Sequence, residues 1–492
     1  MGTRNSIILR NFGRNLSFVP QNHFAPKSEA EVLEILGQFR DKQIRVIGRL
    51  HSWSEIAKCD DVVLDLRCLN EVTLQPRSDG VWASVGAGCQ IKRLLAELER
   101  LGERTTPTVG LITEQTVAGA ISTSTHGSGR HSLSHYVQEI RLATYDHETG
   151  QPIIRILSAG PELDAARCSL GCMGVILSVA FPCRPTYRIE EHIARYARLD
   201  QVLAAEERFP LQQFYLVPWT WNYMVQHRRE TDSPLTWLFW LYRFYCFWML
   251  DISTHLSFLA ISRVFKHRWW THAFFRNILP LAVVRGWKVI DWSPQILTMR
   301  HELFRHIEIE VFVKRSSLAD ALDVITQLLK YCDGDSNAFS PDTLERIQRI
   351  GHFESINGLL GTYTHHCVIC VRKVLPDSPF LSMANSDNEA YYAISFISFA
   401  LGQDREPFLG FAEVLSKLII HLFAGRPHWG KICPINASEV EAVYPRLPEF
   451  RKAVRDCDPT GRFRNNWVSN LLFADETQTD SIANADVKSD RS

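Results

Sequence analysis

The chain has 492 residues, of which 46% are hydrophobic, and it carries 54 basic and 54 acidic residues. Its length allows two or three domains with cores of their own. The balanced charge excludes a general attraction to nucleic acid or other polyanions. The twelve cysteines lack the paired spacing of a disulfide framework or a zinc site, so we predict reduced thiols and no metal centre.

Short apolar segments alternate with glycine-bearing turns in the first part of the chain, from about residue 24 to 185. Two helices are predicted there. The first begins at the N-cap Ser28, with Glu31 completing a capping box, and the second covers residues 89–102 and ends at Gly102. The apolar runs at 44–48, 62–66, 82–88 and 174–181 are predicted strands. This part is therefore a mixed α and β unit.

A stretch crowded with Trp, Phe, Tyr and Leu follows, from Leu235 to Ser262. Arg243 and Asp251 interrupt it, so no uninterrupted run reaches the length of about 20 residues that a membrane-spanning helix needs. Two interpretations stay open. The stretch forms a pair of helices packed in a core or a dimer interface, or it forms a helix lying on a membrane surface, where Trp and Tyr favour the headgroup level.

The rest of the chain predicts an antiparallel sheet backed by helices. Residues 306–315 alternate as in a strand and lead into an amphipathic helix at 317–331. Two more strands are predicted at 365–374 and 390–399, followed by a helix ending at Gly425. The last nineteen residues, 474–492, are polar, and we predict a disordered tail. The fold class is α+β.

The stretch 107–132, PTVGLITEQTVAGAISTSTHGSGRHS, places Gly110, Gly119 and Gly127 among small residues. Such a backbone approaches a ligand closely and presents N–H groups to it. The stretch has neither the Walker pattern nor GxGxxG. From glycine content alone, a tight structural loop and a ligand cradle fit equally well.

Six segments in order resemble the vanillyl-alcohol-oxidase type of FAD-binding domain, also called PCMH-type. They are FAPKSEAEV, RVIGRLHSWSEIA, VVLDLRCLN, VGAGCQIKRL, PTVGLITEQTVAGAISTSTHGSG and CSLGCMGVI. Near the other end, GRPHWGK and DPTGRFRNNW are similar to the sugar-lactone oxidases. The resemblance implies a two-subdomain FAD-binding domain over 1–186 and a substrate, or cap, domain over 187–473 with an aromatic insert at 235–290.

The resemblance also implies the cofactor, FAD, held covalently through His51. In this chain Leu50 stands where the family usually has glycine. A neutral imidazole nitrogen is a good nucleophile, and a turn exposes it. The implied cofactor residues are His51, Ser52, Gly48, Gly110, Thr116, Gly119, Ser122, Thr125, His126, Gly127, Gly174, Val175 and His428.

For catalysis the resemblance implies Lys431 and Arg372. The family pairs this arginine with a glutamate two residues earlier, but Cys370 stands there. Glu310 on a neighbouring predicted strand is our candidate for the missing carboxylate, with Glu308 as its rival, and a charged strand face is the alternative for both. Where relatives place a histidine on the next strand, this chain offers Tyr391, Tyr392 and Ser395.

The implied activity is oxidation of the CH–OH group of an aldonolactone or related polyol, as in arabinonolactone or gulonolactone oxidase, with electrons passing to oxygen or another acceptor. Two alternatives remain: a flavoprotein dehydrogenase acting on a lipid-like substrate, and a catalytically impaired membrane-associated scaffold that binds flavin. We expect an intracellular protein without nucleic-acid partners, with peripheral membrane contact through 235–290. The oligomeric state stays open.

Overall fold

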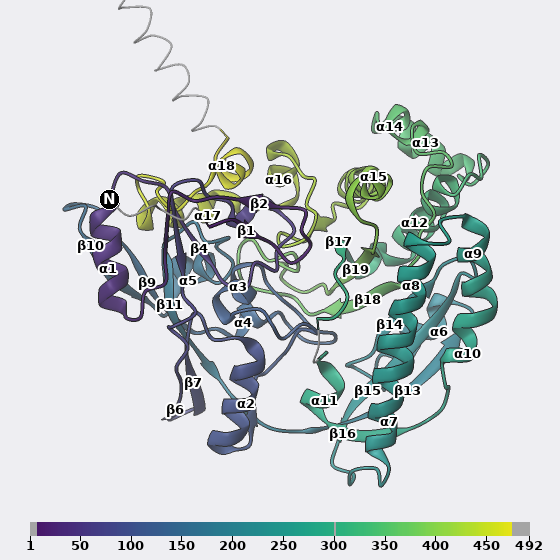
Figure 1. Ribbon diagram of the computed structural model, residues 1–492, viewed down its shortest axis with the longest axis horizontal. Helices are drawn as coiled ribbons and strands as arrows, with labels where there is room; N and C mark the ends of the chain where they lie inside the picture. The colour runs from purple at the N-terminus through teal and green to yellow at the C-terminus, as the bar shows by residue number, and fades with distance from the viewer. Residues whose placement is uncertain (1–6, 300–301, 475–492) are drawn as a thin grey trace, which may run out of the picture.

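The structure is a computed structural model that describes residues 7–299 and 302–474 (Figure 1). The predicted disordered tail lies outside the described residues, apart from residue 474. The N-terminal half carries a parallel sheet in the order β3-β5-β4 and an antiparallel sheet in the order β10-β9-β11-β7-β6. Their strands are β3 (Asn22–Phe24), β4 (Ile44–Ile47), β5 (Val62–Asp65), β6 (Val72–Arg77), β7 (Gly80–Gly86), β9 (Glu139–Tyr145), β10 (Pro152–Leu157) and β11 (Val175–Pro182).

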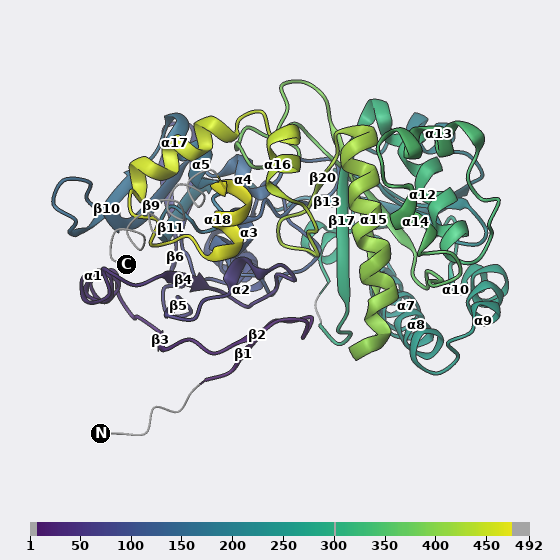
Figure 2. The same cartoon turned by 90° about the horizontal axis from the view of Figure 1, so that it is seen from above.

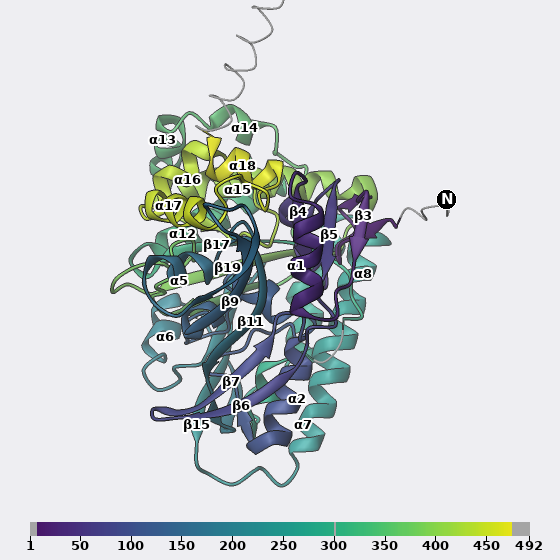
Figure 3. The same ribbon diagram turned by 90° about the vertical axis from the view of Figure 1, so that its left-hand side faces the viewer.

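Helices and two short ribbons complete this half, and Figure 3 shows α1 beside β3, β4 and β5. The helices are α1 (Glu29–Gln38), α2 (Ile91–Gly102), α3 (Val117–Ser122), α4 (Leu133–Tyr136) and α5 (Gly160–Ala166). The ribbons pair β1 (Leu9–Arg10) with β2 (Ser17–Phe18) and β12 (Arg184–Pro185) with β8 (Arg104–Thr105). All four strands predicted from apolar runs are present. The left-handed residue that ends α2, however, is Glu103 (φ 51°) and not Gly102.

An antiparallel sheet of eight strands forms the other half, in the order β16-β13-β15-β14-β18-β19-β17-β20. The strands are β13 (Arg188–Tyr196), β14 (Gln213–Val217), β15 (Asn222–Thr231), β16 (Val289–Trp292), β17 (Ile307–Lys314), β18 (Ile369–Val374), β19 (Tyr391–Ser398) and β20 (Arg426–Pro427). The helices α6 (Leu199–Ala204), α12 (Leu318–Cys332) and α15 (Glu406–Phe423) pack with this sheet in one hydrophobic core. Farther out lie α13 (Pro341–Arg349) and α14 (Phe353–Asn357).

The alternation of β17 decides which side chains face the site. Ile307, Ile309, Val311 and Val313 belong to the core formed with α12 and α15. Because side chains alternate between the two faces of a strand, Glu308 and Glu310 lie on the opposite face. Phe312, on that same face, packs in the core of the N-terminal half. The two glutamates are thus turned toward the glycine-rich loops.

The C-terminal helices return to the N-terminal half (Figure 2). They are α16 (Ala437–Val443), α17 (Leu447–Cys457) and α18 (Asn466–Leu472). Phe450 and Val454 of α17 share a core with Val32 of α1 and Leu163 of α5. The domain boundary at 186/187 remains a prediction, since the chain crosses between the halves twice.

The aromatic insert is not a helix pair packed in the core of this chain, while the dimer interface that was the other form of this expectation stays a prediction. One continuous helix of 25 residues is formed by α7 (Phe239–Tyr245), a π-helical stretch (Cys246–Ser253) and α8 (Thr254–Arg263). Only 11% of the most apolar 18-residue stretch of this helix is buried. By length and composition alone it could cross a membrane. The insert continues through α9 (Arg268–Ala273) and α10 (Leu279–Ala282), and α11 (Ser293–Leu297) follows β16.

Gly129 joins the two halves. Its N–H donates to the carbonyl of Lys373 at 2.7 Å, its φ is +73°, and a Cβ there would overlap the carbonyl oxygen of Pro210. We expect Gly129→Ala to lower the free energy of unfolding by about 3 kcal/mol, the sum of left-handed strain and overpacking. Urea unfolding measures it. Gly150→Ala is the matched control, because Gly150 has φ +63° and open space around it. Equal losses in both variants would contradict the overlap argument.

Candidate active site

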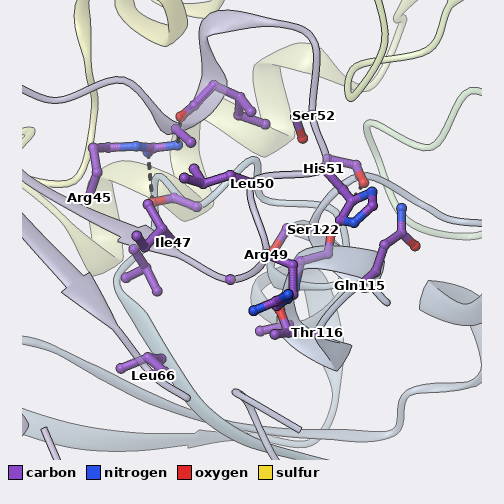
Figure 4. Close-up of a pocket in the computed structure, with 18 of the residues that line it drawn as sticks. Arg45, Ile47, Arg49, Leu50, His51, Ser52, Leu66, Gln115, Thr116 and Ser122 are labelled. Carbon is purple, nitrogen blue, oxygen red and sulfur yellow. Dashed lines mark hydrogen bonds between the residues drawn. The ribbon is translucent and has the colours of Figure 1, made fainter. Parts of the chain in front are cut away.

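The turn after β4 borders a pocket in the N-terminal half (Figure 4). Segments 45–52, 115–123 and 170–176 contribute most of its lining. Gly48 lies so close to Thr116 that a Cβ would overlap the threonine Oγ1, and a Cβ at Gly88 would overlap the carbonyl of Leu66. These glycines therefore allow backbone segments to pack closely around the pocket, which we call the cradle.

Arg45 was missed by the sequence analysis, because nothing in a strand-like apolar run marks an arginine as buried. Its side chain is 2% exposed and donates to four carbonyl groups in three segments, at residues 56, 170–171 and 463. The distances are 3.0 Å to Gly171 and 2.7 Å to Leu170. Burial lowers the pKa of Arg45. Because Nη1 and Nη2 donate to carbonyl groups of these segments, Arg45 holds the walls of the pocket together.

His51 lies in the pocket lining (Figure 4). Its Nε2 is 2.7 Å from Oε1 of Glu302, and its ring stacks on Phe12 with a centroid distance of 4.9 Å. Leu50, which stands in the place of the family glycine, adopts φ +53°. That left-handed conformation explains the glycine preference of the turn. The imidazole is thus held on one side by a carboxylate and on one face by a phenyl ring.

Lys431 lies directly beside this turn. The backbone N–H of Trp53 donates to the carbonyl of Gly430 at 2.9 Å, and Nζ of Lys431 is 4.4 Å from the centre of the Trp53 ring. The ammonium also contacts Oε2 of Glu308 at 2.5 Å. Although burial alone would raise it, Lys431 lowers the pKa of Glu308 to about 2. Glu308 is therefore an anion that holds Lys431 in place.

Glu310 is the centre of a buried polar cluster. Its Oε1 accepts from Oγ of Ser395 at 2.5 Å and lies 3.6 Å from Nη1 of Arg372. Its Oε2 lies 3.4 Å from Nε2 of His126 and 4.0 Å from Nε2 of His428. Although burial opposes it, His126 lowers the pKa of Glu310 well below the usual value. Burial lowers the pKa of His428 to about 3, so this imidazole is neutral.

Strand register explains how Glu310 reaches Arg372 without being its neighbour in sequence. Cys370 of β18 pairs with Ser395 of β19, which pairs with Glu310 of β17. The carboxylate that is absent at Cys370 of β18 is thus supplied by Glu310 of β17, two strands away in the same row of paired residues. Since Glu310 is 2% and Glu308 6% exposed, the alternative of a solvated charged strand face is wrong for both.

Some of the predicted residues line the pocket and others lie elsewhere. Gly48, His51, Ser52, Thr116, Gly119, Ser122 and Gly174 line the pocket. His126 and His428 lie at Glu310 instead, Gly110 packs on Thr125, and Val175 is a core residue of β11. Tyr392 is directed away, with its hydroxyl donating to Glu206 at 2.7 Å. The role of each residue remains a prediction.

Two groups among the described residues have ligand atoms within 4.8 Å of one another: His126, Glu310 and His428, and His131, His135 and Asp377. The prediction of no metal centre therefore remains a prediction. The first group is part of the cluster around Glu310, whose contacts are already used within the protein.

Comparison with known proteins identifies the class. A family model described as an FAD binding domain matches residues 20–149, which supply most of the cradle. The residues present fit that group, since small residues such as Gly48, Gly119 and Ser122 border the pocket and leave room for it. The protein is an FAD-dependent oxidoreductase, which confirms the cofactor expected from the resemblance.

A second model, described as D-arabinono-1,4-lactone oxidase, matches residues 179–471, more than half of the chain. The chain belongs to this family of FAD-dependent sugar-lactone and alcohol oxidases, as the resemblance predicted. Its substrates are small molecules.

Similar proteins carry different names. A protein named long-chain alcohol oxidase, from an uncultured marine euryarchaeote, is 50% identical over 466 residues, 95% of this chain and 97% of that protein. L-gulonolactone oxidase of Scyliorhinus torazame is 25% identical over 94% of this chain and 98% of its own length. A solved structure named solvent-stable cholesterol oxidase has a TM-score of 0.71 at 15% identity, covering 95% and 97% of the two chains. That structure shares the fold, and the α+β, PCMH-type fold is confirmed.

Proposed function

We propose that the protein oxidises the hydroxyl-bearing carbon of a long-chain alcohol. The observation that carries this proposal is the row Cys370–Ser395–Glu310. In this row a thiol and a hydroxyl stand on the two strands where the resemblance implies a glutamate and a histidine. The relative that is 50% identical bears the name long-chain alcohol oxidase. A small cavity beside Arg372 is also bordered by Val109, Leu111, Leu211 and Leu297, in addition to polar neighbours.

The side chains around Glu310 have the chemistry for this reaction. FAD, when bound, supplies the acceptor for hydride. Glu310, kept ionised by its neighbours, accepts the hydroxyl proton, which is then held between Oε2 and Nε2 of His126, 3.4 Å apart. Arg372 and Lys431 bring positive charge toward the charge that develops during oxidation. Glu308 fixes Lys431, and Trp53 packs against the ammonium.

A sugar lactone or polyol is the second candidate, supported by the family model and by Lys431 in the HWGK segment. Purified holoenzyme is mixed with dodecanol, L-gulonolactone, sorbitol or cholesterol, while flavin absorbance and oxygen uptake are followed. We expect the fastest bleaching of the flavin with dodecanol. Turnover of the lactone or sorbitol alone would defeat the long-chain proposal. Bound flavin that none of the four bleaches would support the impaired scaffold.

A covalent link at His51 is the finer proposal for the cofactor, supported by the position of the ring in the cradle and by Glu302 at Nε2. A carboxylate beside Nε2 of His51 favours the tautomer with its proton on Nε2, and this tautomer leaves Nδ1 free as a nucleophile. We expect flavin colour to stay with acid-precipitated wild-type protein and to move into the supernatant with His51→Ala. Ser52→Ala, which changes the next pocket residue, retains the colour in the pellet. Free flavin from the wild type would contradict the link.

The exposed face of the insert supports a membrane contact, which explains how a lipid-like substrate is reached. We define the apolar surface as the exposed side chains Trp237, Trp240, Phe244, Trp248, Leu256, Trp269, Trp270 and Leu281, between 46% and 89% exposed. All but Trp237, which lies in the turn before α7, come from the helices at the outer edge in Figure 1. The same stretch of the chain carries exposed cations, at Arg263, Lys266, Arg268, Arg276 and Arg285. Aromatic rings together with cations suit the headgroup level of an anionic bilayer.

We expect the wild type to sediment with vesicles of phosphatidylserine and phosphatidylcholine. The triple variant Trp237→Ser, Trp240→Ser and Phe244→Ser is expected to bind at least tenfold more weakly, because apolar burial drives interfacial binding. Ile156→Ser is the control, since Ile156 is 57% exposed on β10 in the other half. Unchanged sedimentation of the triple variant would remove the membrane proposal.

A further inference from the structure

A row of buried polar side chains crosses the eight-stranded sheet and ends at Arg372. Strand register makes its members neighbours: Glu191 of β13 pairs with Arg228 of β15, and Gln226 of β15 pairs with Gln213 of β14. Gln213 then pairs with Arg372 of β18. Glu191, Gln213 and Arg228 are 3–6% exposed. Gln226 is partly buried, and Gln213, Arg228 and Arg372 border the small cavity described above, so the row is largely enclosed by the protein.

Hydrogen bonds run along the row without a break. Arg228 Nε donates to Glu191, and Arg228 Nη2 donates to Oε1 of Gln226 at 3.2 Å. Nε2 of Gln213 donates to the same oxygen at 2.5 Å. Oε1 of Gln213 then accepts from Nε of Arg372 at 3.4 Å. At the far end, Tyr242 of α7 donates its hydroxyl to Glu191 at 2.6 Å.

The donor and acceptor chemistry gives the row a direction. A guanidinium only donates, so Gln226 must present its oxygen to Arg228. Because the Gln226 oxygen also faces Gln213, Gln213 must turn its NH₂ group toward it. The oxygen of Gln213 is then left to accept from Arg372. If Gln226 were reversed, its NH₂ would face the donors of Arg228, which is unfavourable in a buried site. The side chain of Arg228 thus fixes both amides and, through them, the guanidinium of Arg372.

We propose that Arg228 is a positioning residue for Arg372, holding Nη1 at its 3.6 Å separation from Glu310. Glu191 keeps Arg228 charged: although burial alone would lower it, the carboxylate raises the pKa of Arg228. The inference rests on the role that the proposed function gives Arg372. It adds four residues on three further strands, Glu191, Arg228, Gln226 and Gln213, and gives none of them a contact with the reacting atoms.

Three variants test the inference in the holoenzyme. Arg228→Lys retains a donor-only group, Arg228→Gln allows either amide orientation, and Gln226→Leu removes the shared acceptor while leaving Arg228 on Glu191. We expect kcat to fall about tenfold in Arg228→Gln and Gln226→Leu with KM changed less than threefold, and to stay within threefold of wild type in Arg228→Lys. The substrate is whichever compound the wild type turns over fastest.

The control is Gln212→Leu, which removes a buried glutamine bonded to Val202 and His227 but outside the row. If its loss of kcat and of melting temperature matches that of Gln226→Leu, the row is merely structural and the proposal is overturned. A crystal structure of Gln226→Leu gives a readout independent of substrate. We expect Arg372 turned away from Glu310, and an unmoved Arg372 overturns the proposal even when the proposed substrate class is wrong.

Discussion

Lys431→Met is expected to lower kcat by a factor of about 10² to 10³ while FAD remains bound. The ammonium lies between the Trp53 ring and Glu308, beside the turn that carries His51. Removing a positioned charge from a buried site costs about the same as removing an oxyanion-hole donor. Rapid reduction of the flavin by substrate, followed without oxygen, measures the loss at the oxidation step itself.

The same change also leaves Glu308 buried without its cation, which lowers the free energy of unfolding by about 3 kcal/mol. The double variant Lys431→Met with Glu308→Leu removes that unpaired charge. We expect it to recover most of the stability and none of the activity. If activity returned together with stability, Lys431 would be a structural residue and its proposed role would be wrong.

Glu310→Gln is expected to lower kcat/KM by a factor of about 10² to 10³, because an amide cannot accept the hydroxyl proton. The amide is isosteric and still accepts from Ser395, so the fold is retained. In the wild type the depressed pKa of Glu310 keeps this base ionised above its ordinary value near 4.5. Activity is lost only when the pH falls through the lowered pKa of Glu310 and the carboxylate takes up a proton. We therefore expect the ionisation of Glu310 to cause no change in kcat/KM above pH 4.5.

Glu439→Gln is the matched control for this prediction. Glu439 is a second buried glutamate, 4% exposed, that accepts from Lys417 at 2.7 Å and from His421 at 3.1 Å. We expect Glu439→Gln to lower the melting temperature while kcat/KM stays within threefold of wild type. A larger loss of activity in Glu439→Gln than in Glu310→Gln would contradict the assignment of Glu310 as the base.

Local rules predicted most of the elements. Ser28 caps α1 by accepting from the N–H of Glu31 at 3.2 Å, as the capping pattern required. The other half of the predicted box differs, since the Glu31 carboxylate accepts from the N–H of Lys27. Both outcomes satisfy a free N–H at a helix start, and the sequence cannot distinguish two adjacent donors. The end of α2 was displaced for a similar reason, because Glu103 tolerates the left-handed conformation at a local cost.

The site was only partly predictable. Segment order identified the cradle, because its glycines lie within the short segments that carry the resemblance. Glu310 could be named as a candidate but not placed, since its approach to Arg372 depends on the register of three strands. Glu302, Arg45 and the Glu191–Arg228 pair were not foreseen at all. Apart from the bond of Arg45 to Ile56, their partners named here are more than 30 residues away in sequence, and no local pattern records such a contact.

The return of the last helices to the N-terminal half has a consequence for biosynthesis. The N–H of Ile44 at the start of β4 donates to the carbonyl of Arg462 at 2.8 Å, and Asn465 donates to the carbonyl of Glu55 at 2.8 Å. Strand β4 and the turn near Glu55, which border the flavin cradle, therefore lack these bonds until residues 462 and 465 emerge from the ribosome. We expect stable cofactor capture only after nearly complete translation, so nascent chains stalled before residue 460 should be colourless.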